Sequence, residues 1–145
     1  MNRSPDSAAL VRRYRPWLLA ASMYNLTWGA LNVCAPQAIF AVLGIRPPSY
    51  PPIWQVVGMF VLLYGLAYWW AARDPVRHRH LIAIGLLGKL SGPAGFLWAA
   101  ATGALPLSFG IVILMNDVVW WPALGACLWE VAGGLDGLNQ LLAGR

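Results

Sequence analysis

The chain has 145 residues and a mass of 15.8 kDa, which suits one domain rather than two. Apolar residues make up 59% of it and charged residues only 10%, against roughly a quarter in an ordinary soluble domain. Despite a net charge of +5, the charged residues are too few to cover the surface of so small a globule. This excludes a disordered chain, a coiled coil and a water-soluble enzyme. We therefore expect an all-α protein that lies in a lipid bilayer.

Four apolar runs predict a four-helix transmembrane bundle, because a helix of about 20 residues at ~1.5 Å each crosses the bilayer. The runs cover residues 17–35, 53–72, 81–101 and 107–129. Arg15-Pro16 is expected to open the first helix, and residues 46–52 to form an extended connector, since proline restricts both itself and the residue before it. Residues 37–43 predict a short helix at the membrane surface. The leucines of residues 135–142 predict a short amphipathic helix.

The basic residues predict how the bundle is oriented. Those that flank the expected helices on one side are Arg3, Arg12, Arg13, Arg15, Arg73, Arg77, Arg79 and Arg145. Arg46 falls on the other side, and Lys89 falls within a helix. Cytoplasmic loops carry the excess of Lys and Arg, so both termini are expected in the cytoplasm, with the chain in the inner membrane of a bacterium. Topology and anionic lipid account for the positive charge, and no nucleic-acid partner is expected.

Two ionisable residues stand where a membrane helix ordinarily has none, Lys89 in the third expected helix and Asp117 in the fourth. A charge at the bilayer centre costs roughly 2.5–3.5 kcal/mol, so such residues usually face the bundle interior and pair. Lys89 lies ~12 Å from one edge of the ~30 Å core and Asp117 ~15 Å from the opposite edge. The two are within about one helical turn of each other, and we expect a Lys89–Asp117 ion pair.

Other side chains are expected at a similar depth. Asn25, Tyr64 and Asn116 offer hydrogen-bonding groups, so that all four helices contribute to one polar layer. Trp28, Trp120 and Trp121 lie deeper than the tryptophans that mark membrane interfaces, which favours a role as walls of a cavity. Each indole N–H needs an acceptor at that depth.

Prolines and glycines mark the same layer. Pro93 cannot donate a hydrogen bond to the carbonyl of Lys89, and Pro122 likewise frees the carbonyl of Val118. Both are expected to kink their helices, and freed carbonyls are tolerated in a membrane only against protein or water. Small residues are expected to let the second and third helices approach their neighbours closely. They are Gly58, Gly65, Gly85, Gly88, Gly92 and Gly95.

The cysteines and histidines indicate no metal or redox centre. Cys34 and Cys127 fall near opposite ends of their helices, roughly 20 Å apart in depth, whereas bridged α-carbons lie within about 7 Å of each other. His78 and His80 share one loop without a cluster of thiolates or carboxylates. We expect no metal site, and no cofactor is indicated.

Four stretches resemble a family of small bacterial four-helix membrane proteins that are similar in outline to DoxX-like proteins. They are WQVVGMFVLLYG (54–65), AARDPVRH (71–78), GLLGKLSGP (85–93) and NDVVWWP (116–122). Members are commonly labelled hypothetical or alkyl hydroperoxide reductase. Peroxidatic chemistry needs an activated thiolate, and neither cysteine here has a charged neighbour in sequence. The resemblance covers most of residues 15–129 and implies the fold without a mechanism.

Three functional hypotheses follow from the polar layer. The first is a membrane protein that binds or permeates a small or lipophilic molecule. In it Lys89 holds an anionic or carbonyl group, and Asp117 balances the charge and can relay a proton. The second is an accessory or assembly subunit whose polar layer is structural. The third is a quinone- or lipid-linked enzyme. The expected partners are the lipid bilayer and either further copies of the chain or a larger membrane complex.

Overall fold

The computed structural model describes residues 7–144, and every regular element in this range is a helix. Three long helices come first, and a short helix separates the first of them from the second. A broken segment and a short helix follow. In chain order the elements are α1 (Ser7–Cys34), α2 (Ala38–Leu43), α3 (Pro51–Ala71), α4 (Arg79–Ala101), η1 (Leu107–Phe109), α5 (Gly110–Asn116), η2 (Val118–Trp120), α6 (Trp121–Ala132) and α7 (Leu135–Leu142). The short helices α2 and α7 confirm the predictions for residues 37–43 and 135–142.

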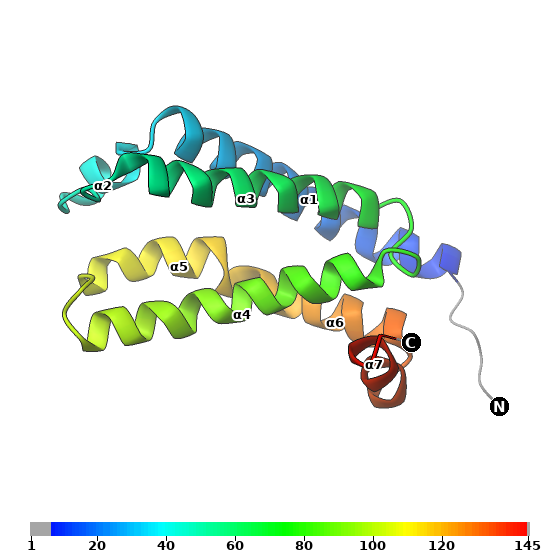
Figure 1. The fold of residues 1–145 in the computed structure, drawn as a ribbon. Helices are drawn as coiled ribbons and strands as arrows, with labels where there is room; N and C mark the ends of the chain where they lie inside the picture. The colour runs from blue at the N-terminus through cyan, green and yellow to red at the C-terminus, as the bar shows by residue number, and fades with distance from the viewer. Residues whose placement is uncertain (1–6, 145) are drawn as a thin grey trace.

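The helices form two antiparallel pairs that lie side by side (Figure 1). One pair is α1 with α3, and the other is α4 with the segment from α5 to α6. We call the end of the bundle near α7 the α7 end and the opposite end, near α2, the α2 end. Towards the α7 end the two pairs contact each other through α1 with α6 and α3 with α4.

Within residues 7–144, three helical segments are long and apolar enough to cross a membrane: α3, α4 and Leu107–Ala132. They coincide with three of the four predicted runs and indicate a multi-pass membrane protein. The prediction that residues 17–35 form a fourth run of this kind is not met, although α1 is long enough. Ser22, Asn25 and Asn32 are buried on this helix, and such polar side chains lower its hydropathy.

The prediction that Arg15-Pro16 opens the first helix is wrong, because α1 begins at Ser7 and contains Pro16. Leu10, Tyr14 and Leu18 recur every four residues and are all buried in the core at the α7 end. Packing of this stripe stabilises the turns before Pro16 and offsets the backbone hydrogen bond that proline cannot make.

Small residues bring α1 and α3 together along their length. A Cβ atom built at Gly29 would lie 2.8 Å from the Gly58 carbonyl oxygen, so the two backbones are in direct contact there. Towards the α7 end the Ser22 hydroxyl donates to the Gly65 carbonyl at 2.8 Å. Towards the α2 end Gln55 Nε2 donates to the carbonyl of Val33, also at 2.8 Å. Close approach on the small-residue side of α3 is therefore confirmed.

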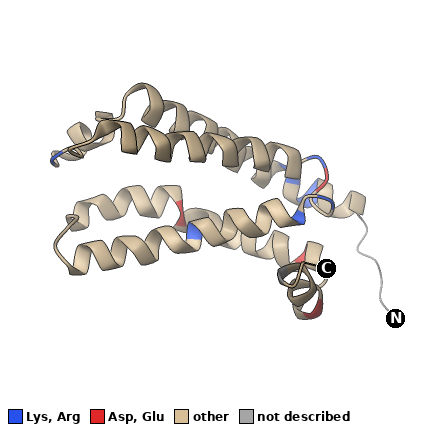
Figure 2. Ribbon diagram, viewed as in Figure 1, with Lys and Arg blue, Asp and Glu red and all other residues tan. Residues whose placement is uncertain are grey.

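Charged residues gather at the α7 end (Figure 2), at the start of α1 and in the connection between α3 and α4. The connection between α2 and α3, which carries Arg46, lies at the α2 end. Lys89 and Asp117 stand apart from both groups, midway along the bundle. Arg3 and Arg145, which the orientation argument also uses, lie outside the described residues.

We predict that Gly58→Ala destabilises the protein and that Gly95→Ala does not. Alanine favours a helix over glycine by about 1 kcal/mol at either site. At position 58 its Cβ would lie 2.9 Å from the Gly29 carbonyl oxygen, whereas nothing lies within 4 Å at position 95. The free energy of unfolding in mixed micelles should fall by about 1–3 kcal/mol for Gly58→Ala alone. Equal stability of the two variants would contradict the close contact of α1 with α3.

Candidate ligand-binding cavity

The polar layer lies between two apolar clusters that close the two ends of the bundle. The cluster at the α7 end contains Tyr68, Ile82 and Leu124, each at most 1% exposed. The cluster at the α2 end is smaller and aromatic: Phe40 and Trp54 both pack on Phe109, with ring centroids 6.0 Å apart in each pair. This aromatic cluster joins the α1–α3 pair to the segment that begins with η1 at the α2 end.

The last membrane segment is broken in its middle, where a single kinked helix was predicted. Helix α5 ends at Asn116, Asp117 has φ −119° and ψ −63°, and α6 begins at Trp121 with Pro122 in its first turn. Proline in the first helical turn needs no backbone donor, which explains why the chain restarts there rather than bending. The break leaves the Asn116 carbonyl at the end of α5, since the N–H of Trp120 bonds to the Asp117 carbonyl instead.

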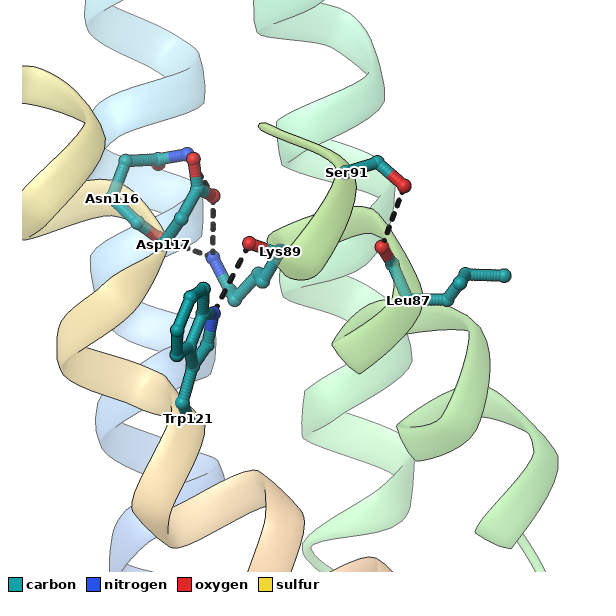
Figure 3. A network of polar contacts seen from close by, with 6 residues as sticks. All are labelled: Leu87, Lys89, Ser91, Asn116, Asp117 and Trp121. Carbon is teal, nitrogen blue, oxygen red and sulfur yellow. Dashed lines mark hydrogen bonds and ion pairs between the residues drawn. The ribbon is translucent and has the colours of Figure 1, made fainter. Parts of the chain in front are cut away.

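Lys89 of α4 binds at this break (Figure 3). Its Nζ donates to the Asn116 carbonyl oxygen at 2.5 Å and lies 3.8 Å from Asp117 Oδ1. The side-chain nitrogen of Asn116, Nδ2, donates to the same carboxylate oxygen at 2.8 Å. Both charged side chains are over nine-tenths buried, at 7% and 8% exposed. The predicted Lys89–Asp117 ion pair is thus confirmed, and Asn116 belongs to it.

Trp121 supplies the hydrogen bond that Pro93 cannot make. Pro93 lies inside α4, and the Lys89 carbonyl four residues earlier has no N–H partner within the helix. The Trp121 indole nitrogen donates to this carbonyl at 3.1 Å (Figure 3). The freed carbonyl therefore faces protein, as the bilayer requires. Trp121 and Asp117 together hold the broken segment against α4 on both sides of Lys89.

A cavity of about 370 Å³ lies beside the ion pair. Its volume falls in the range typical of small-molecule sites, ~300–1,000 Å³. Residues of α1, α3, α4 and the broken segment line it. The lining residues are Asn25 and Trp28 of α1; Trp54, Val57, Phe60, Val61, Tyr64 and Tyr68 of α3; Gly85, Gly88, Lys89 and Gly92 of α4; and Phe109, Val112, Ile113, Asn116 and Asp117 of the broken segment.

Six of the seven residues predicted for the site line this cavity, and Trp120 does not. Trp120 packs against Tyr24, with ring centroids 5.4 Å apart, and its indole nitrogen is buried with no partner in the described part of the chain. Ser91, a neighbour of Lys89 in sequence, is exposed and bonds to the Leu87 carbonyl of its own helix (Figure 3). It takes no part in the cavity.

Most of the apolar wall was not predicted from the sequence. On α3 only Tyr64 was predicted, although Trp54, Val57, Val61, Tyr64 and Tyr68 recur at alternating spacings of three and four. That spacing puts them on one face of the helix, and this periodicity is the signal that identifies them. Trp121 was predicted as a cavity wall, but it lies outside the lining and bonds to the Lys89 carbonyl, a relation that its distance in sequence from Pro93 hides.

The glycines of α4 make room for side chains rather than for a neighbouring backbone. A Cβ atom at Gly92 would lie 2.5 Å from Asp117 Oδ2, and the Tyr68 ring packs against Gly85. At Gly95 nothing lies within 4 Å. Close helix approach along this face was predicted. In the structure Gly85 and Gly92 instead leave room for the polar side chains of Tyr68 and Asp117.

Several buried polar atoms in the layer are without partners among residues 7–144. They include Asn25 Oδ1, Asn116 Oδ1 and the Tyr68 hydroxyl, and all three residues line the cavity. Asn25 is 2% exposed and Tyr68 0%. A buried polar group without a partner costs about 1–3 kcal/mol. The described residues contain no group of three or more His, Cys, Asp and Glu that could hold a metal ion, and Cys127 is buried in the apolar core.

No protein-family model, curated protein or solved structure matches the chain. The resemblance to small four-helix membrane proteins therefore stays a prediction, and the function is argued from the cavity alone.

We predict that removing both charges is less damaging than the two single changes suggest. Lys89→Met or Asp117→Leu alone strands a buried charge and should cost about 3–5 kcal/mol. The free energy of unfolding of the double variant should fall by less than the sum of the two single losses, because no unpaired charge remains. Unfolding in mixed micelles measures the coupling, and strict additivity would show that the pair does not interact.

We also predict that Trp121→Phe costs about 1 kcal/mol in the natural chain, the usual worth of a hydrogen bond inside a membrane bundle. In the Pro93→Ala background it should cost much less. The reason is that the new backbone N–H at position 93 can bond to the Lys89 carbonyl in place of the indole. A double-mutant cycle over these two sites tests the relation, and an equal loss in both backgrounds would refute it.

Proposed function

We propose that this protein binds, or lets through, a small lipophilic molecule in the cavity between its membrane helices. The observation that carries the proposal is the coincidence of three features at one depth: a cavity of about 370 Å³, a buried ion pair and unpartnered polar atoms on its wall. Polar groups that served only to fix helix register would satisfy one another, and packing would fill the space between them.

The proposal includes a placement in the membrane. Helix α1 runs antiparallel along α3 in contact from Ser22 to Val33, so a membrane that α3 crosses also surrounds α1. That gives four crossings in spite of the polar side chains of α1, because Ser22 and Asn32 bond to α3 and Asn25 lines the cavity. The basic residues of the α7 end support an inner-membrane protein with both termini in the cytoplasm. Association with further copies or a larger complex belongs to the same proposal.

The side chains have different roles in this site. Lys89 and Asp117 hold the broken segment in place, since the Lys89 ammonium already binds the Asn116 carbonyl and faces Asp117. This revises the hypothesis that Lys89 itself holds an anionic or carbonyl group of the ligand. Asn25, Asn116 and Tyr64 are the groups proposed to bond to the ligand. Trp28 is proposed as part of the wall that contacts its apolar part.

We expect native mass spectrometry of the protein, extracted gently from its own membrane, to show a retained small molecule. Asn25→Leu should reduce its occupancy about tenfold, the loss of one to two hydrogen bonds to a desolvated group. The matched control is Ser91→Ala, which removes an exposed hydroxyl at a similar depth. An empty cavity together with a stoichiometric partner chain would instead favour the accessory subunit and a structural role for the polar layer.

A further inference from the structure

The cavity opens sideways between α3 and α4. Two of its lining residues on α3 face outward, Val57 at 42% and Phe60 at 59% exposed, and Gly88 on α4 is also exposed. The lining on the other side, Asn25 and Lys89, is buried. In helices that cross a membrane, the outward side faces lipid chains. A molecule in the bilayer can therefore reach the polar layer without passing through water.

A groove on the outside of α3 and α4 continues from this opening. It has a volume of about 350 Å³ and shares Phe60 and Tyr64 with the cavity. Beyond them Ala67 and Trp70 of α3 and Leu81 of α4 line it towards the α7 end. From position 60 to position 70 the helix rises ~15 Å. The groove is thus apolar and extends along α3, an arrangement that suits an alkyl chain.

The polar atoms inside the cavity select the head of such a molecule. Lys89 and Asp117 balance each other, so a charged head would bring a charge without a counter-ion. The unpartnered oxygens of Asn25 and Asn116 are acceptors, which need a donor, and the Tyr68 hydroxyl can donate or accept. A hydroxyl group is neutral, donates one hydrogen bond, which Asn25 Oδ1 or Asn116 Oδ1 can accept, and accepts one from the Tyr68 hydroxyl. A carboxylate offers only acceptors and a negative charge.

From this geometry we propose that the ligand is a neutral single-chain amphiphile with a hydroxyl head. It enters from the bilayer between α3 and α4, past Tyr64. Its head donates to Asn25 Oδ1 or Asn116 Oδ1 and accepts from the Tyr68 hydroxyl, the unpartnered tyrosine of the cavity, and its chain lies in the groove. This inference rests on the proposed function and adds the class of ligand and its route.

Photolabelling of the full chain in lipid nanodiscs tests the inference, with dodecanol, dodecanoic acid and dodecane as matched probes. Each probe carries a diazirine, either beside the head or at the chain end. Head-labelled dodecanol should mark the peptides that hold Asn25 or Asn116, and chain-end dodecanol the peptide that holds Leu81. We expect labelling by dodecanol about tenfold above that by the acid or the alkane, the size of effect that polar pairing in a buried site gives.

Two glycines on one helix provide the matched variants. A Cβ atom at Gly88 would lie 3.8 Å from the Tyr64 hydroxyl, so the longer side chain of Gly88→Leu should close the passage and reduce head labelling about tenfold. Gly95→Leu, on the same helix in open space, should leave it unchanged. Ala67→Trp fills the groove alone and should abolish chain-end labelling while the head label remains.

Equal or stronger labelling by the acid, head labelling that survives Gly88→Leu, or chain-end labelling that survives Ala67→Trp would overturn this inference. Neither result would touch the proposed function, since a molecule would still occupy the cavity. Absence of labelling by every probe also overturns the inference. The retained molecule seen by mass spectrometry then decides separately whether the cavity binds a ligand of another class.

Discussion

The hydrogen bond from Lys89 to the Asn116 carbonyl is the interaction on which the rest of the structure depends. A break in a membrane helix leaves backbone carbonyls without donors, at a cost of several kcal/mol for each group exposed to lipid. Here the ammonium group binds the carbonyl at the end of α5, and Asp117, the first residue of the break, balances its charge. The break and the two charges therefore stabilise one another, although each alone would be unfavourable in a membrane.

This arrangement also explains why space remains in the interior. Both α5 and α6 contact α4, but α6 also packs on α1 in the core of the α7 end. At the α2 end aromatic side chains such as Phe109 and Trp54 join the two pairs instead. The cavity lies between this core and the aromatic cluster.

The sequence predicted the membrane character, three of the spans and the ion pair because each depends on a local property: hydropathy, proline chemistry or depth along a helix. The effect of Pro93 was predicted in part, since the freed Lys89 carbonyl follows from local geometry. Its partner Trp121 follows only from how α4 packs against the broken segment. The role of Trp120 was misjudged for the same reason. Depth alone cannot tell which way a side chain turns around its helix, and Trp120 turns towards Tyr24.

The contact of Gly29 with Gly58 has a mechanical consequence. It makes the α1–α3 pair a stiff unit, because two backbones in direct contact leave no soft side chains between them to deform. The α4 pair is joined to this unit by the connection of residues 72–78, whose Ala72 and Pro75 are buried in the core. A rotation of one pair against the other would therefore pivot at the α7 end, and its amplitude would grow towards the α2 end. Such a rotation would leave the ion pair intact, because Lys89 and Asp117 both belong to the α4 pair, and would instead act on the aromatic contacts of Phe109 with Phe40 and Trp54 at the α2 end.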